Sequence, residues 1–284
     1  MKPLQKAHAN VFIPSQETLE VALQKTTHMA IGAHQDDLEI MAYHGIVSCF
    51  QQKDKSFTGI VVTDGAGSAR SNEYQSYSDD MMKEVRILEQ NKAAMLGEYG
   101  AMIQLGYPSK ETKDPHNHLL VEELAMLLTV AKPQILYTHN LADKHDTHIG
   151  VVTKVIQAIR SLEPSIRPQQ VWGCEVWRDL DWLSDQAKVL LPSDQHPNLA
   201  AALVEVFDSQ IVGGKRYDLA CIGRRLANAT YFESHAVDTA KSMTFAMDLT
   251  PLIIDDTLDI TQFVLNHIDA FKQDVQRRVQ SMLP

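Results

Sequence analysis

The sequence of 284 residues predicts an α/β protein: a Rossmann-like three-layer sandwich with a mostly parallel sheet and a helical carboxyl-terminal extension. Up to about residue 180, short apolar runs bounded by turn residues alternate with stretches of helical periodicity. Strands separated by helices pair in parallel through right-handed crossovers, which places helices on both faces of the sheet. Hydrophobic residues make up 44% of the chain and charged residues 22%, the balance of a globular protein. We expect one domain over 1–284, with a core at about 26–180 that residues 181–284 complete.

The expected elements follow the chain in order. The expected strands are His28–Ala33, Thr58–Thr63, Met102–Leu105, Gln134–Thr138 and Val171–Val176. The helices between them are expected near Asp37–Gln52, Asp80–Tyr99, Leu119–Ala131 and His148–Leu162, each with apolar positions three or four residues apart. Beyond Trp177 we expect helices at Pro197–Ser209, Lys215–Glu233 and Ile260–Met282, with a mixed segment through Ile254. The polar loop Asp64–Asp79 is expected to be mobile and to lie over the carboxyl edge of the sheet.

Charge and composition exclude several classes of protein. The chain carries 26 basic and 36 acidic side chains, a net charge of −10, whereas a nucleic-acid-binding protein needs clustered Lys and Arg. No run approaches the ~20 apolar residues that cross a bilayer, and no apolar signal core follows Met1. We therefore expect a cytoplasmic protein without a membrane or nucleic-acid partner. The 3 cysteines are widely spaced, which supports neither a disulfide framework nor a thiolate zinc site.

Two segments rich in His and Asp carry the functional signal. The first, Ala33-His34-Gln35-Asp36-Asp37-Leu38-Glu39, begins where the first expected strand ends. The second, His139-Asn140-Leu141-Ala142-Asp143-Lys144-His145-Asp146-Thr147-His148, begins where the strand Gln134–Thr138 ends. Because the carboxyl ends of parallel strands lie at one edge of a sheet, both segments are expected to line one crevice. Crowded carboxylates raise one another's pKa, so a cluster this tight indicates a bound cation or a reaction that requires it.

Two histidines and one carboxylate would leave positions open for water and substrate, which is typical of a catalytic zinc site. The same ligands also suit Fe²⁺ or another divalent metal. Either segment alone is equally consistent with helix capping by Asp36 or Asp37 and with histidines bonded to loop carbonyls. The two segments together at one sheet edge favour a metal.

The chain resembles the PIG-L / LmbE-like family of metal-dependent N-acetylglucosaminyl deacetylases over about residues 28–152. The family motif A-H-P-D-D-x-E is matched at 33–39 with Gln35 in place of Pro, and a T-D-G-rich turn is matched at 63–67. An R-x-x-E helix followed by Ala and Leu-Gly is echoed by Arg86, Glu89, Ala93 and Leu96-Gly97. The second metal motif, H-P-D-H preceded by an Asp, has its counterpart at 143–148, where Thr147 replaces the more common Asp.

The resemblance implies a role for each matching residue. His34, Asp37 and His148 would be the ligands of Zn²⁺, and Asp36 would take a proton from the attacking water. His145 would stabilise the oxyanion as a cationic donor, and either Asp36 or His145 would protonate the departing amine. Arg70 is similar to loop arginines that contact substrate in relatives, although a solvated surface Arg is the preferred alternative.

The replacement at Thr147 leaves His145 without its usual carboxylate partner. We expect Asp143 to contact the ring of His145 and raise its pKa, and Asp146 to cap the helix that begins at Thr147. The first hypothesis is therefore a deacetylase acting on a small N-acetylated amino sugar or its conjugate. A two-metal phosphoesterase and a metal-dependent sugar-binding protein without turnover are the alternatives.

The sequence leaves the roles of several other side chains undecided. Lone histidines such as His139 and His44 are more often packed structural residues than functional ones. Trp172, Trp177 and Trp182 lie close together in sequence and would suit sugar stacking, an oligomer interface or core packing. A homo-oligomer is compatible with the sequence but not predicted by any motif.

Overall fold

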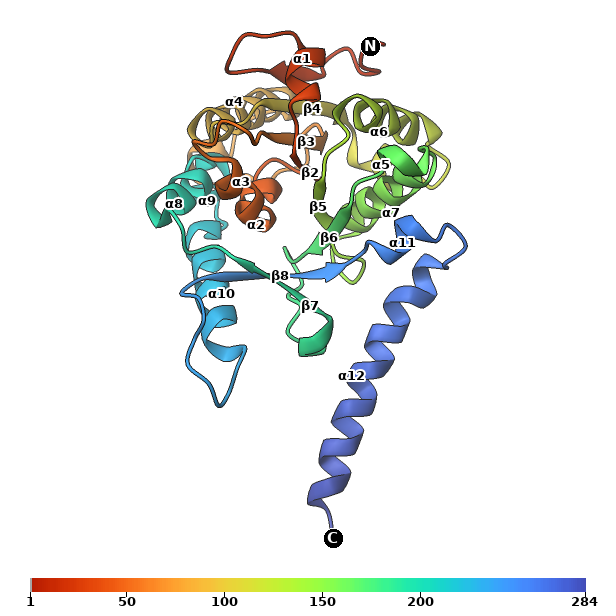
Figure 1. Cartoon of the computed structure of the whole chain (residues 1–284). Helices are drawn as coiled ribbons and strands as arrows, with labels where there is room; N and C mark the ends of the chain where they lie inside the picture. The colour runs from red at the N-terminus through yellow and green to blue at the C-terminus, as the bar shows by residue number, and fades with distance from the viewer. Residues whose placement is uncertain (1) are drawn as a thin grey trace.

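The computed structural model describes residues 2–284 and contains an eight-stranded mixed sheet with helices on both faces (Figure 1). The strands are β1 (Asn10–Phe12), β2 (His28–Gly32), β3 (Phe57–Thr63), β4 (Ala101–Tyr107), β5 (Ile135–His139), β6 (Gln170–Cys174), β7 (Lys188–Pro192) and β8 (Met243–Asp248). Their order is β1-β4-β3-β2-β5-β6-β8-β7. The central strands β4, β3, β2, β5 and β6 are parallel, while β1, β8 and β7 pair antiparallel with their neighbours.

The helices are α1 (Leu19–Gln24), α2 (Asp37–Met41), α3 (Tyr43–Cys49), α4 (Asp79–Leu96), α5 (Ser109–Lys113), α6 (His118–Ala131), α7 (Asp146–Arg160), α8 (Pro197–Glu205), α9 (Asp208–Ile211), α10 (Tyr217–Tyr231), α11 (Pro251–Ile254) and α12 (Ile260–Met282). Short 3₁₀ helices lie at Asn72–Tyr74, Pro164–Ile166 and Asp185–Ala187. The segments α1, α6 and α7 cover one face of the sheet, and α2, α3, α4 and α8 cover the other.

Side chains that alternate along the strands contribute to two hydrophobic cores, one on each face of the sheet. On β2, Met29 and Ile31 belong to the core under α6 and α7, whereas Ala30 belongs to the core under α2 and α3. On β3, Ile60 and Val62 likewise oppose Val61. Successive side chains of a strand point to opposite faces, so strands covered on both faces read as continuous apolar runs. Because these strands are buried on both faces, their apolar runs allow them to be predicted from the sequence.

The predicted fold class is confirmed, with differences at its edges. All five expected strands are present with their ends shifted by one to a few residues. The helix expected over Asp37–Gln52 is broken at Ala42, whose φ of −113° and ψ of 20° separate α2 from α3. The carboxyl-terminal extension is not only helical, because β7 and β8 extend the sheet beyond β6. These strands and β1 pair antiparallel at the sheet's margins, so they fall outside the repeated pattern of parallel strands joined by helices.

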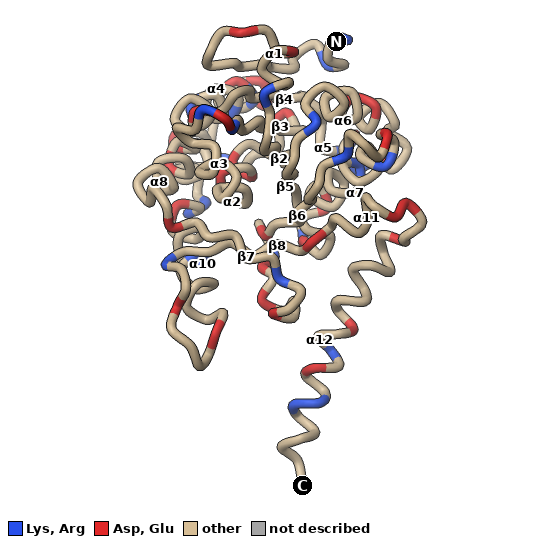
Figure 2. The backbone as a smooth tube through the Cα atoms, in the orientation of Figure 1, with Lys and Arg blue, Asp and Glu red and all other residues tan. Residues whose placement is uncertain are grey.

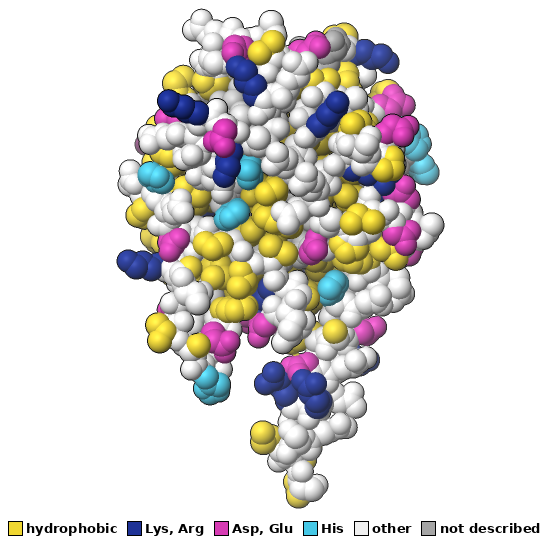
Figure 3. Space-filling model, viewed as in Figure 1, with side chains coloured by type: hydrophobic (Ala, Val, Ile, Leu, Met, Phe, Trp, Pro, Cys, Tyr) yellow, Lys and Arg dark blue, Asp and Glu magenta, His cyan; other side chains and the backbone are white. Residues whose placement is uncertain are grey.

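The surface follows the composition. In Figure 2, Lys and Arg are interspersed with Asp and Glu and do not gather into a basic face. Figure 3 shows hydrophobic side chains grouped in the middle of this face of the body, with charged groups mostly around them.

The helix α12 runs away from the body, and none of its residues is buried (Figure 1). Within residues 2–284, none of the helices combines the length and apolar character that a bilayer span requires.

The loop at 64–78 is hydrogen-bonded to the segment after α8. The hydroxyl of Tyr74 donates to Asp208 Oδ2 at 2.6 Å, and Asn72 Nδ2 donates to the carbonyl of Val212 at 2.5 Å. Both contacts join segments far apart in the sequence, so the loop forms one wall of the crevice at the carboxyl edge of the sheet.

A buried histidine predicts how stability depends on pH. His28, at the start of β2, is 6% exposed, and burial, with the nearby Lys55 and His44, lowers its pKa to about 4. The unfolded chain therefore binds a proton at this residue between pH ~6.5 and ~4 while the folded chain does not, so stability falls as the pH falls through this window. We expect a loss of up to about 3 kcal/mol from this group.

Unfolding in urea at pH 7 and pH 4.5 measures the effect, with the His28→Asn variant as the matched comparison. The variant should lose less stability than the native chain between the two pH values. Equal losses in both proteins would show that His28 does not carry this dependence.

Candidate metal centre and active site

Adjacent parallel strands bring the two predicted segments together. The strands β2 and β5 pair directly, so the β2–α2 loop and the β5–α7 loop leave the sheet side by side. At the first loop, Asp36 adopts the left-handed conformation with φ of 86°, which Asp tolerates better than most residues. This turn sends the chain from the strand directly into α2, whose first residue is Asp37.

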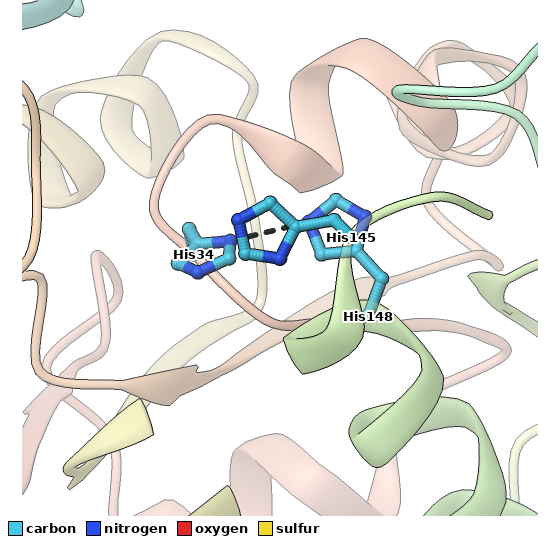
Figure 4. Close-up of side chains that lie close together, drawn as sticks. All are labelled: His34, His145 and His148. Carbon is cyan, nitrogen blue, oxygen red and sulfur yellow. Dashed lines mark hydrogen bonds between the residues drawn. The ribbon is translucent and has the colours of Figure 1, made fainter. Parts of the chain in front are cut away.

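Three side chains that the sequence predicts as ligands converge on one point. His34 Nδ1 lies 3.2 Å from His148 Nε2 (Figure 4). The same nitrogen lies 3.3 Å from Asp37 Oδ2. His148 Nε2 lies 3.4 Å from the same Asp37 oxygen. Tetrahedral zinc with bonds of about 2.0–2.1 Å separates its ligand atoms by about 3.3 Å. The spacing of these three atoms therefore fits a divalent ion between them.

The proton positions also fit a cation. His148 Nδ1 lies 3.3 Å from Asp143 Oδ2, and because a carboxylate only accepts, the proton of this ring sits on Nδ1. The lone pair of His148 Nε2 then faces Asp37 and His34. Metal-binding histidines commonly donate their other ring N–H to a carboxylate, which fixes the tautomer. Asp143 holds His148 in this way.

The structure contradicts two expectations for this loop. Asp143 does not contact the ring of His145: its carboxylate accepts from the ring of His148 and, at 3.0 Å, from the backbone N–H of His145. Asp146 does not cap α7, because the cap is His145, whose Nδ1 accepts from Thr147 N at 3.3 Å. A bend at Lys144 lies between Asp143 and the helix, and its effect on the side chains is not revealed by residue spacing alone.

His145 is a neutral donor in this arrangement. Since its Nδ1 accepts a backbone N–H, its proton sits on Nε2. Burial, together with the neighbouring His34, lowers its pKa. The ring stacks on His148 with centroids 4.7 Å apart and lies at the cavity wall. The ring is therefore neutral rather than cationic as expected, and it carries an Nε2–H.

His139 lies inside the cluster, although the sequence favoured a packed structural residue. Its Nε2 is 3.4 Å from Asp37 Oδ2, and its ring stacks on His148 with centroids 3.8 Å apart. The same Nε2 accepts the backbone N–H of Ala33 at 2.9 Å, so its lone pair is already used. His139 thus packs against the cluster through Asp37 and His148. Its position at the end of β5, on the same sheet edge as His34, was the feature of the sequence that could have predicted this. His44, in contrast, bonds Tyr137 at 2.9 Å, away from the cluster.

A buried arginine on α4 holds Asp36. Arg86 Nη2 donates to Asp36 Oδ2 at 2.8 Å and also to the carbonyl of Gln35. Its Nη1 donates to Glu89 Oε2 at 3.1 Å, and Glu89 in turn accepts from Ser209. The sequence offered Arg86 and Glu89 only as echoes of a family motif, and the link to Ser209 was not predicted.

The paired carboxylates are shifted in opposite directions. Burial raises the pKa of Asp36 to about 6, and Arg86 offsets part of this effect. Burial also acts to raise the pKa of Asp37, but the adjacent His148 and His139 hold it well below its usual range. Two neighbouring groups with divergent pKa values are suited to different tasks, one as a permanent anion and the other as a proton acceptor.

Arg70 does not reach the cavity. Its Nη2 donates to the carbonyl of Ala66 and to Asp79 Oδ1, both at 2.6 Å. The neighbouring Ser68 and Ala69 line the cavity instead. The side chain of Arg70 is only 24% exposed, so it is not the solvated surface arginine that was the preferred alternative either.

A two-lobed cavity opens onto the cluster. The larger lobe, of about 600 Å³, contains His34 and His145 in its wall. The smaller lobe, of about 280 Å³, extends from Asp36 and Asp37 toward α10. Trp177 lines both lobes, so of the three tryptophans it is the one placed for a ligand.

The comparison with known families agrees with the geometry. Residues 29–159 match the model of the PIG-L family, described as GlcNAc-PI de-N-acetylase. This match confirms, over these residues, the resemblance that the sequence motifs indicate. The matched segment contains both halves of the cluster, from His34 to His148. A search of curated proteins gives no match.

Solved structures share this fold at low sequence identity. N,N'-diacetylchitobiose deacetylase from Pyrococcus horikoshii has a TM-score of 0.64 and 13% identity, covering 87% of this chain and 98% of its own. 4-carboxy-2-hydroxymuconate hydratase from Pseudomonas putida KT2440 has a TM-score of 0.58 and 14% identity, covering 79% and 96%. A zinc-inhibited form of teicoplanin deacetylase has a TM-score of 0.53 and 15% identity, covering 79% and 98%. A hydratase and deacetylases thus share the fold, and the reaction must be argued from the site.

Proposed function

We propose that this protein is a metal-dependent hydrolase that removes the acetyl group from an N-acetylated amino sugar or a conjugate of one. The observation that carries the proposal is the convergence of His34 Nδ1, Asp37 Oδ2 and His148 Nε2 at 3.2–3.4 Å from one another. Asp36 and His145 lie beside this cluster at the wall of a cavity. The family match and the deacetylases among the similar structures support the same reaction.

His34, Asp37 and His148 would hold the ion, and we propose zinc, with Fe²⁺ as the alternative, because both accept two imidazoles and a carboxylate. When bound, a divalent ion polarises an acyl oxygen and lowers the pKa of water from ~16 toward ~7. The chain supplies the remaining groups, each already positioned by contacts within the protein.

Asp36 moves the proton. One of its oxygens is held by Arg86, and the other is available to take a proton from the attacking water. As the water oxygen adds to the acetamide carbon, His145 Nε2–H donates a hydrogen bond to the acyl oxygen, where negative charge develops. Protonated Asp36 then delivers its proton to the amide nitrogen as the carbon–nitrogen bond breaks. The products are acetate and a free amine on the sugar.

Acetate release from a panel of N-acetylhexosamine conjugates tests the proposal, with metal content measured on the same sample. We expect release that follows the metal content, with one ion per chain. Two ions per chain together with phosphate release from a phosphomonoester would instead establish the phosphoesterase alternative. Metal-dependent sugar binding without acetate release would establish the binding-protein alternative.

The carboxylate of Asp143 provides a further prediction. Because Asp143 orients the ring of His148, the Asp143→Asn variant should bind the metal about 10- to 100-fold more weakly. Asp146→Asn is the matched control, since this neighbouring carboxylate is exposed and touches none of the three proposed ligands. Competition with a metal-binding dye measures both affinities. Equal affinities in the two variants would remove Asp143 from the metal site.

A further inference from the structure

The two lobes of the cavity meet at a shared wall and differ in chemistry. Residues that line both lobes are Asp36, Asp37, Lys144, Trp177 and Tyr217. The proposed reaction needs the scissile amide at Asp36, on this wall. One side of the amide therefore extends into each lobe, and the lobes decide which substituents fit.

The smaller lobe has an apolar wall beside its charged and polar lining residues. Ile40 of α2, Val176 after β6, and Ala220 and Cys221 of α10 line it together with Trp177. A sugar ring placed here would lose hydrogen bonds from its hydroxyl groups to water, which is costly unless the protein replaces them.

The polar groups at the floor of the smaller lobe are mostly used by the protein itself. Glu175 accepts from Asn228 and from the backbone N–H groups of Phe245 and Leu180. Arg225 Nη2 donates to the carbonyls of Glu39 and Ile40, which leaves its Nε as a buried donor without a partner. Arg224 donates to the carbonyl of Val176. The lobe thus offers few partners for the hydroxyl groups of a sugar.

The larger lobe offers more polar side chains that the protein itself does not use. Lys113, Lys144 and Lys215 line it from three separate segments, and none of them forms an ion pair with a carboxylate within residues 2–284. Ser68 and Gln210 add a hydroxyl and an amide. Free donors and acceptors suit the hydroxyl groups of a sugar. The amino-sugar side of the amide therefore belongs in the larger lobe.

We propose that the smaller lobe is an acyl-binding site and that the enzyme accepts N-acyl chains longer than acetyl. This inference rests on the proposed function. An acetyl group places a single methyl beyond the carbonyl, whereas the lobe has about 280 Å³, compared with about 30 Å³ for one water molecule in the liquid. Several methylene groups fit into this volume, and their transfer from water into apolar surroundings is favourable.

Binding and turnover along a chain-length series test the inference. The substrates are N-acetyl-, N-propanoyl- and N-butanoyl-glucosamine. We expect kcat/KM for release of glucosamine by the native protein to rise about fourfold with each added methylene. Dissociation constants measured by calorimetry on the Asp36→Asn variant, in which turnover is slow, should fall by a similar factor.

A variant that fills the lobe locates the effect. Ala220→Trp places an indole in the smaller lobe and should reduce the butanoyl-to-acetyl ratio of kcat/KM to about one or below. Leu219→Trp is the control, because Leu219 is 60% exposed on the same helix and lines neither lobe. This control should keep the ratio of the native protein.

The outcomes separate the two proposals. Cleavage of the acetyl substrate with affinity that is flat or falls along the series would overturn the acyl site and leave the deacetylase intact. Affinity that rises along the series without any cleavage would support the acyl site and overturn the proposed reaction. A chain-length preference that survives Ala220→Trp would also overturn the acyl site.

Discussion

Replacing Asp36 by Asn should lower kcat for acetate release by about 100-fold or more, the usual contribution of a general base. The amide oxygen of Asn can still accept the N–H of Arg86, so the loop should keep its shape, but the amide cannot take a proton from water. Metal content should stay at the native level, because Asp36 is not among the three converging atoms. Steady-state acetate release with elemental analysis of the same sample measures both quantities.

The matched control for this variant is Asp80→Asn, which changes an exposed carboxylate on α4 that pairs with Lys83. Its kcat should equal that of the native protein. If Asp36→Asn retains turnover within a few-fold of native while metal is bound, Asp36 is not the proton acceptor and its proposed role is wrong.

The meeting of the two segments that carry His34, Asp37 and His148 could be predicted because it depends on topology, whereas the choice of these three residues as ligands came from the family resemblance. Both segments follow strands that are buried on both faces and therefore easy to recognise, and the carboxyl ends of parallel strands share one edge. No detail of side-chain geometry was needed for this step. The direct pairing of β2 with β5 then brings the atoms within 3.4 Å.

The partner of each histidine could not be predicted in the same way. Asp143 is two residues from His145 and five from His148, yet it contacts the ring of His148. The turn before α7 decides this, because it directs the backbone N–H of His145 toward Asp143 and the N–H of Thr147 toward the ring of His145. Spacing along the sequence favours the nearer residue, whereas local backbone geometry selects the farther one.

Contacts between residues far apart in the sequence could not be predicted either. Arg86 reaches Asp36 from α4, and Ser209 reaches Glu89 from α9, 120 residues away. The strand β8 lies in the segment expected to be mixed, because its antiparallel pairing with β6 and β7 falls outside the pattern of parallel strands joined by helices. The smaller lobe depends on α10, which packs against β8, and therefore could not be anticipated.

Replacing His148 by Ala should remove most of the bound metal and, with it, acetate release. The variant deletes one of three converging donor atoms and leaves Asp143, which is 7% exposed, without its ring partner. A buried acceptor that loses its partner costs about 1–3 kcal/mol, so the variant should fold with reduced stability. Circular dichroism and thermal unfolding establish the folded fraction, and elemental analysis of that fraction gives the metal content.

A second variant keeps this prediction testable if His148→Ala unfolds. His34→Ala removes a donor whose side chain is 25% exposed, so it should disturb packing less while losing metal to the same extent. His116→Ala, on the exposed loop before α6, is the control and should retain the native metal content. Because His139 uses its Nε2 lone pair for the N–H of Ala33, it cannot replace either ligand without breaking that bond. A folded His34→Ala or His148→Ala protein that keeps one ion per chain would therefore place the metal elsewhere and remove the basis of the proposed hydrolysis.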